Sequence, residues 1–164
     1  MGKNYILDAG AAEIKLRRMA FEILENNEGE QGLILVGIRE NGLVIAEILS
    51  RLLLEINNTR SECISLSLDK RFPTDVQLSQ TPNCDGRVLI LVDDVSNTGK
   101  TLLYALKPFL TFHPKKIQSL VMVDRTHKLF PVRPSYVGLS VATTLQEHIF
   151  VEVDGLQIAG AWLE

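Results

Sequence analysis

The sequence predicts a doubly wound α/β fold, in which helices cover both faces of a parallel β-sheet. Short apolar runs such as residues 32–38 and 88–92 have the composition of strands that are buried on both faces. Segments whose apolar residues follow the spacing of one helical face alternate with these runs along the chain. Strands that alternate with helices form right-handed βαβ crossovers, and these crossovers build a parallel sheet.

The expected elements follow one another in a regular order. The strands are the apolar runs at residues 32–38, 63–68, 88–94 and 117–123. The helices are the segments with helical spacing at residues 16–24, 45–56 and 102–110. Asn26, Asn27 and Gly29 are expected to end the first helix, because these residues favour turns over helix.

Two segments depart from this alternation. Residues 69–86 are polar, contain two prolines and show no sustained period, which is typical of a long loop that acts as a lid or is disordered. After Arg125 the chain contains short extended pieces at residues 135–142 and 148–154. We expect these pieces to be additional strands, either at an edge of the core sheet or in a small flap.

Length and composition limit the function classes. A chain of 164 residues is expected to form one domain, residues 1–164. The 17 Lys and Arg against 20 Asp and Glu give a formal charge of −3, which provides no overall attraction to nucleic acid or an anionic membrane. Two cysteines without zinc-site spacing, and no apparent signal peptide or membrane span, predict a cytoplasmic protein in a reducing compartment.

The most informative stretch is VLILVDDVSNTGKT, residues 88–101. It ends like a nucleotide-binding loop of the G-x-x-x-x-G-K-[ST] type, but Asp94 stands where that loop needs its first glycine. A carboxylate at this position would repel a triphosphate. Ordinary triphosphate-loop chemistry is therefore disfavoured.

A buried strand, two carboxylates and a Ser/Asn/Thr/Gly turn suit a different ligand. Backbone amides of residues 96–101, with the hydroxyls of Thr98 and Thr101, are expected to form a cradle for one phosphate monoester. Asp93 and Asp94 would face neighbouring hydroxyls or a hydrated Mg²⁺. A ligand that carries a phosphate and neighbouring hydroxyls and binds a metal ion is expected to be a phosphorylated sugar. The alternative is that the turn only caps a helix and that the two aspartates only end a strand.

This stretch resembles the phosphoribosyl pyrophosphate (PRPP) motif of type I phosphoribosyltransferases, an apolar strand followed by two acidic residues and a turn ending in Thr-Gly-x-Thr. Residues 5–27, 32–52 and 123–144 are similar to segments of one subgroup, the pyrimidine-operon attenuator proteins that are also uracil phosphoribosyltransferases. The resemblance covers nearly the whole chain in the same order. It implies a type I phosphoribosyltransferase fold with a small hood of extended segments.

The resemblance also implies roles for individual residues. The residues implied to bind the 5-phosphate of PRPP are Val95, Ser96, Asn97, Thr98, Gly99, Lys100 and Thr101. Those implied to bind pyrophosphate are Gly37, Ile38, Arg39 and Glu40. Asp93 and Asp94 are implied to contact the ribose hydroxyls, to act in catalysis and to hold Mg²⁺ through water or PRPP. Asp124 and Arg125 follow the fourth strand, where the family places residues beside the base.

Two covering segments are implied as well. The hood over the base would come from about residues 130–160 together with N-terminal residues, and residues 69–86 match the mobile catalytic loop. Lys70 and Arg71 on this loop would then act in catalysis, by neutralising the leaving group while the closed loop excludes water. The alternative for these two cations is a solvated loop.

The sequence departs from the subgroup at three places. Asn41 stands where a basic residue usually precedes the second glycine of the pyrophosphate loop. The strand at residues 63–68 runs into LSLDKRFP (residues 66–73) where the subgroup usually has a sequence like Tyr-Arg-Asp-Asp, and the loop that follows is shorter. The change at residues 66–73 removes the usual position of the catalytic arginine. The shorter loop predicts weaker closure over the site, or none.

The leading hypothesis is an Mg²⁺-dependent phosphoribosyltransferase of pyrimidine salvage, which joins PRPP to a nucleobase, uracil, and releases pyrophosphate. The resemblance suggests a homodimer. One alternative is a regulatory protein that senses PRPP or a nucleotide and contacts RNA with little turnover, although the net negative charge disfavours RNA. A second alternative is a phosphoribosyltransferase that uses a purine base.

Overall fold

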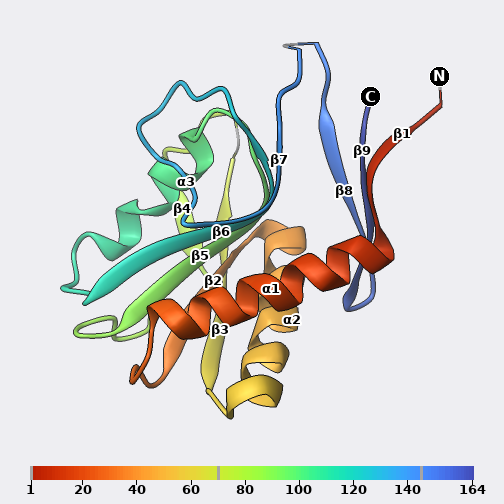
Figure 1. Cartoon of the computed structure of the whole chain (residues 1–164). Coiled ribbons are helices and arrows are strands. Elements are labelled where there is room, and N and C mark those ends of the chain that lie inside the picture. The colour runs from red at the N-terminus through yellow and green to blue at the C-terminus, as the bar shows by residue number, and fades with distance from the viewer. Residues whose placement is uncertain (1, 70, 145) are drawn as a thin grey trace.

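A computed structural model describes residues 2–69, 71–144 and 146–164 of the chain, so the predicted loop cation Lys70 lies outside the described residues. In the described residues, a six-stranded sheet with the order β4-β3-β2-β5-β6-β7 forms the centre of the fold (Figure 1). Its strands are β2 (Leu33–Ile38), β3 (Ser61–Leu68), β4 (Val76–Leu78), β5 (Val88–Ser96), β6 (Lys116–Arg125) and β7 (Tyr136–Val141).

The central sheet is parallel except at one edge. Strands β3, β2, β5, β6 and β7 pair in parallel, and only β4 runs antiparallel to its neighbour β3. Parallel neighbours need crossover connections. A helix at Arg39–Asn57 connects β2 with β3, and a helix at Lys100–Ala105 lies between β5 and β6, whereas residues 126–135 connect β6 with β7 without a helix. The predicted doubly wound α/β fold is confirmed.

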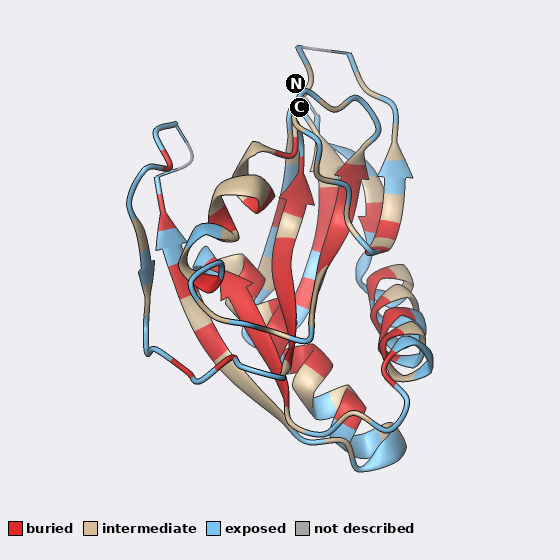
Figure 2. Ribbon diagram, turned by 90° about the vertical axis from the view of Figure 1, so that its left-hand side faces the viewer, coloured by how far each residue is buried: buried red, intermediate tan, exposed pale blue. Residues whose placement is uncertain are grey.

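Helices cover both faces of this sheet. Helices α1 (Ala9–Asn26) and α2 (Arg39–Asn57) pack on one face, and α3 (Lys100–Ala105) with the 3₁₀ helix η1 (Lys107–Phe109) packs on the other. Successive side chains of β2 enter the two cores in turn: Leu35 joins the core under α1 and α2, and Val36 joins the core under α3. This arrangement explains why the central strands are apolar at consecutive positions, and Figure 2 shows them buried along most of their length.

A second, three-stranded antiparallel sheet, called here the small sheet, lies beside the first turns of α1 (Figure 1). Its strands, in the order β1-β9-β8, are β1 (Asn4–Asp8), β8 (Ile149–Asp154) and β9 (Gln157–Leu163). Leu7, Val151 and Ile158 of this sheet are buried in the same core as α1 and α2. The small sheet is therefore packed onto the body of the domain.

The two extended pieces predicted after Arg125 join different sheets. Residues 136–141 form β7 at an edge of the central sheet, whereas residues 149–154 form β8 in the small sheet. Strands β1 and β9 were not predicted. They pair with each other across nearly the whole length of the sequence, which no local pattern reveals.

Two predictions of local structure were wrong. The segment 69–86 is not without regular structure, because Val76–Leu78 forms β4 at the open edge of β3. The third helix ends at Ala105 and continues only as the short helix η1, instead of running to residue 110. Pro108 explains this, since proline has no backbone N–H for the helical hydrogen bond to residue 104. None of the described helices is long and apolar enough to span a membrane.

Candidate active site

The turn from β2 into α2 is packed tightly against β5. A Cβ atom on Gly37 would lie 2.3 Å from the Cα of Leu43, and a Cβ atom on Gly42 would lie 2.5 Å from the carbonyl oxygen of Val92. Only glycine fits these two positions, so the turn can lie directly beside the end of β5. Arg39, the first residue of α2, has a positive φ of 57°, which is uncommon for a residue with a side chain. The turn therefore holds a conformation that its surroundings must stabilise.

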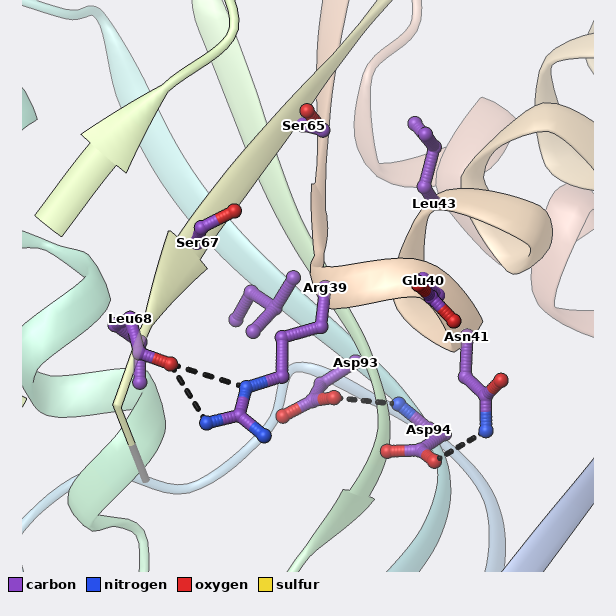
Figure 3. Close-up of a pocket in the computed structure, with 10 residues that line it drawn as sticks. Arg39, Glu40, Asn41, Leu43, Ser65, Ser67, Leu68, Asp93 and Asp94 are labelled. Atoms are coloured by element: carbon purple, nitrogen blue, oxygen red, sulfur yellow. Dashed lines mark hydrogen bonds between the residues drawn. The ribbon is translucent and has the colours of Figure 1, made fainter. Parts of the chain in front are cut away.

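The side chain of Arg39 is fixed by the neighbouring strand. Its Nε and Nη2 atoms donate hydrogen bonds to the carbonyl oxygen of Leu68, at 3.1 Å and 2.6 Å. Figure 3 shows the guanidinium between Leu68, at the end of β3, and Asp93 on β5. Arg39 thus connects the predicted pyrophosphate loop with the residue that precedes the 69–86 segment.

A cavity of about 640 Å³ opens at the carboxyl ends of β2, β3 and β5. Its polar lining residues are Arg39, Glu40, Asn41, Ser65, Ser67, Asp93 and Asp94. This lining has three carboxylates and one guanidinium, and in open α/β sheets the carboxyl ends of the strands are the usual place for a ligand. We call it the β2–β5 cavity.

The two predicted acidic residues lie at the rim of this cavity. Asp93 is buried, with 1% of its surface exposed, and its Oδ1 accepts a hydrogen bond from the amide of Asp94 at 2.8 Å. Asp94 Oδ1 accepts one from the amide of Val95, also at 2.8 Å. Asp94 Oδ2 accepts one from the side-chain amide of Asn41, at 3.0 Å (Figure 3). These bonds fix the orientation of both carboxylates.

A second cavity of about 150 Å³ is also lined by Asp93 and lies at the turn between β5 and α3. It is lined by Asp93, Val95, Ser96, Asn97, Thr98, Gly99, Lys100, Thr101 and Leu102. Gly99 has a φ of 89°, and a Cβ atom there would lie 2.9 Å from the carbonyl oxygen of Val132. The Thr98 hydroxyl accepts a hydrogen bond from the amide of Lys100 at 3.3 Å. The turn therefore encloses a small space lined by the seven residues predicted to bind the 5-phosphate, and we call it the turn cavity.

Residues 3–154 match the family model described as the phosphoribosyl transferase domain. The chain belongs to the phosphoribosyltransferase family.

Relatives and solved structures agree with this assignment. The chain is 36% identical over 159 residues to the bifunctional protein PyrR of Geobacter sp. strain M21, covering 91% of this chain and 90% of the relative. It is 36% identical over 168 residues to the bifunctional protein PyrR of Pelotomaculum thermopropionicum, covering 93% and 92%. These matches confirm the resemblance to one subgroup of type I phosphoribosyltransferases.

Solved phosphoribosyltransferases share the fold at low identity. The hypoxanthine phosphoribosyltransferase of Trypanosoma cruzi superimposes with a TM-score of 0.80 at 16% identity, covering 98% of this chain and 97% of the other. A hypoxanthine-guanine phosphoribosyltransferase of Bacillus anthracis gives 0.76 at 19% identity, covering 97% of each chain. At this identity the similarity concerns the fold alone.

The predicted base-side residues of this phosphoribosyltransferase are held by protein groups. Asp124 is buried and forms an ion pair with Lys128, with 2.5 Å between Oδ1 and Nζ. Arg125 donates a hydrogen bond from Nη2 to the carbonyl oxygen of Glu147, in the segment that leads to the small sheet. Neither Asn41 nor Lys128 was predicted to act in the site. Asn41 was noted only as a departure from the subgroup, and no periodicity or motif identifies Lys128, because the partners of both residues are remote in sequence.

The predicted catalytic loop contacts the turn of residues 95–101, called here the phosphate turn after its predicted role. The amides of Arg71 and Phe72 donate hydrogen bonds to the Asp69 carboxylate, which lowers the pKa of Asp69. Lys100, which follows Gly99, donates from Nζ to the carbonyl oxygen of Arg71 at 3.3 Å. Arg71 itself is exposed and is not among the described residues that line either cavity. The structure thus brings the loop backbone, and not the Arg71 side chain, to the phosphate turn.

Proposed function

We propose that this phosphoribosyltransferase transfers ribose 5-phosphate from PRPP to uracil, with release of pyrophosphate, in an Mg²⁺-dependent reaction. The observation that carries this proposal is that Asp93 lines both the β2–β5 cavity and the turn cavity. PRPP has a ribose with a phosphate at one end and a pyrophosphate at the other. A buried carboxylate between two cavities suits the hydroxyls of such a ribose.

In this proposal the turn cavity holds the 5-phosphate. Residues 95–101 line this cavity, and its small size suits one phosphate group. The binding groups in this proposal are their backbone amides and the hydroxyls of Thr98 and Thr101. Each hydrogen bond to a charged group contributes about 1.5–3 kcal/mol, so several converging donors are sufficient to anchor the substrate. The neighbouring acidic pair would then meet the ribose hydroxyls.

The β2–β5 cavity would receive the pyrophosphate. Arg39 and the backbone of residues 37–40 are the binding groups in this proposal, and the same cavity is lined by the carboxylates of Glu40, Asp93 and Asp94. An anion entering this oxygen-rich cavity needs additional positive charge. The cavity therefore fits a hard cation such as Mg²⁺, which proteins often hold through one or two carboxylates together with substrate phosphates.

The residues of this chain contribute mainly by positioning the substrate. Asp93 and Asp94 would hold the ribose between the two cavities, and Asp94 would remain oriented by Asn41. Bound Mg²⁺ would supply charge neutralisation at the pyrophosphate oxygens. The base would lie near Asp124 and Arg125, whose own contacts fix the loop after β6. Orientation and fixed charges of this kind are sufficient for a large rate enhancement.

The deciding experiment is an incubation of the protein with PRPP, Mg²⁺ and one base at a time. Uracil, cytosine, hypoxanthine, guanine, adenine and orotate would be compared by quantifying nucleoside monophosphate and pyrophosphate. We expect uridine monophosphate with uracil alone, and no product when the metal is chelated. Product with hypoxanthine or guanine instead would show that the substrate is a purine base and not uracil.

A regulatory protein with little turnover is the second candidate function. It is favoured by Asn41, which brings no charge to the pyrophosphate loop, and by Arg39, whose guanidinium is engaged by Leu68. Saturable PRPP binding without product formation would support it. RNA binding that weakens steeply with salt would support it further, because protein contacts to phosphates release counterions.

Sedimentation of the protein would test the homodimer that the resemblance suggests.

A further inference from the structure

We propose that Lys128 is a positioning residue that orients the backbone of the phosphate turn without touching the substrate. This inference rests on the proposed function of the turn cavity. Lys128 lies four residues after Asp124, in the loop that follows β6, and only 5% of its side-chain surface is exposed. Burying an ammonium group costs free energy unless the group is hydrogen-bonded. The groups that bond Lys128 therefore indicate which part of the fold it stabilises.

The partners of Lys128 are carbonyl groups of the phosphate turn and groups at the end of β6. Nζ lies 3.2 Å from the carbonyl oxygen of Ser96, 3.1 Å from the Ser96 hydroxyl and 2.9 Å from the carbonyl oxygen of Asn97. It also lies 2.5 Å from Asp124 Oδ1 and 2.9 Å from the carbonyl oxygen of Arg125. One ammonium therefore joins the predicted phosphate turn to the predicted base-side residues.

The residues after Lys128 continue the same contact. The amides of Leu129 and Phe130 both donate to the carbonyl oxygen of Thr98, at 3.1 Å and 3.0 Å. As a result, three successive carbonyl groups of the turn, those of Ser96, Asn97 and Thr98, are bonded to residues 128–130. Gly99 then packs against the carbonyl oxygens of Phe130 and Val132, which leaves no room for a side chain.

This pattern fixes the direction of the amide groups. In a trans peptide the carbonyl and the next amide point in opposite directions. When the carbonyls of residues 96–98 face residues 128–130, the amides of residues 97–99 face the other way, on the side of the turn cavity that these residues line. Lys128 would thus aim the phosphate-binding amides by holding the opposite ends of the same peptide groups.

The test compares two ligands that the proposed function assigns to different cavities. Ribose 5-phosphate probes the turn cavity, and pyrophosphate with Mg²⁺ probes the β2–β5 cavity, each by titration calorimetry. Lys128→Met removes the ammonium with little change in shape. Lys116→Met is the matched control, since Lys116 donates to the carbonyl oxygen of Asn26 at the opposite end of β6, at 2.8 Å.

We expect Lys128→Met to weaken the binding of ribose 5-phosphate by about tenfold or more, because hydrogen bonds that involve charged groups are strong. Binding of pyrophosphate with Mg²⁺ should remain within about twofold of wild type, and the KM for PRPP should rise with little change in kcat. Lys116→Met should leave both affinities unchanged. Lys128→Arg, which keeps a charged donor, should restore part of the lost affinity.

Lys128→Met leaves the buried carboxylate of Asp124 without its ion pair, so this variant is vulnerable to unfolding. If it does not fold, the double variant Lys128→Met with Asp124→Asn is compared with Asp124→Asn alone, in which the lysine still holds the turn. Equal losses for both ligands, or no loss for ribose 5-phosphate, would overturn the positioning role. If wild type binds neither ribose 5-phosphate nor PRPP, the proposed function fails first, and this inference fails with it.

Discussion

The side-chain amide of Asn41 donates hydrogen bonds both to Asp94 Oδ2, at 3.0 Å, and to the carbonyl oxygen of Val151, at 3.1 Å. Asn41 lies in the first turn of α2, Asp94 on β5 and Val151 in the small sheet. One neutral side chain therefore connects the predicted pyrophosphate loop, the acidic pair and the small sheet. Both amide hydrogens are used by acceptors, which suits asparagine at this position.

We expect Asn41→Asp to reduce turnover by about tenfold or more, because a second carboxylate would lie against Asp94 and like charges at such a distance disfavour each other. Asn41→Leu removes the hydrogen bonds without adding charge and should cost less. Steady-state kinetics of the two variants would separate the two effects. A fully active Asn41→Asp would show that the orientation of Asp94 is unimportant.

Replacing the acidic pair should abolish turnover and leave the fold intact. In Asp93→Asn with Asp94→Asn, the side-chain oxygens still accept the backbone amides that the carboxylates accept now, whereas the charge that faces the ribose is lost. Activity and the thermal midpoint are measured together. Glu25→Gln with Glu28→Gln, on exposed residues at the end of α1, is the control for the change in charge. If the double variant remains active, Asp93 and Asp94 are not the catalytic residues.

Gly99→Ala should lower both stability and phosphate affinity more than Gly29→Ala does. Both glycines have a positive φ, 89° and 78°, so both substitutions carry the same kind of backbone strain. Only at Gly99 would the new methyl group meet the Val132 carbonyl, because nothing lies within 4 Å of a Cβ atom at Gly29. Denaturant unfolding and ribose 5-phosphate titration measure the difference. Equal effects would mean that the close contact at Gly99 is unimportant.

Arg39→Met should weaken the binding of pyrophosphate with Mg²⁺ by about tenfold, as expected for the loss of a charged donor. Arg39→Lys should recover only part of this affinity, because an ammonium does not reproduce the two-pronged contact of Arg39 with the Leu68 carbonyl. Arg51→Met, at an exposed position of α2, controls for the loss of positive charge. If Arg39→Met binds pyrophosphate as tightly as wild type in this titration, the pyrophosphate site does not include Arg39.

The turn at the start of the 69–86 segment should open at acid pH. Hydrogen bonds from the amides of Arg71 and Phe72 lower the pKa of Asp69. A carboxyl whose pKa is lowered by folding stabilises the folded turn above its ordinary pKa of about 3.9, and this contribution is lost as the pH falls through the lower folded value. Amide exchange of Arg71 and Phe72, followed from pH 6 downward, should therefore accelerate beyond its intrinsic trend. In Asp69→Asn this acceleration should be absent, since asparagine does not titrate; if it persists there, another group controls the turn.

Local sequence was sufficient to predict the strands at the centre of the main sheet. Strands such as β2 and β5 are buried on both faces and are therefore apolar at successive positions, which is visible without any tertiary contact. The end of α1 at Asn26 follows from residues that favour turns. The residues predicted to bind the 5-phosphate, 95–101, line one cavity, and they could be named from sequence because they are consecutive in the chain.

Contacts between distant segments were decided only by the tertiary structure. Strand β4 forms because an open edge of β3 offers hydrogen bonds, and β1 forms because it meets β9 from the other end of the chain. Lys128 and Asn41 look like ordinary polar residues in the sequence, and their roles arise from carbonyl and carboxylate groups that folding brings beside them. Sequence periodicity reports which face of an element is buried, whereas hydrogen-bond partners depend on which elements become neighbours.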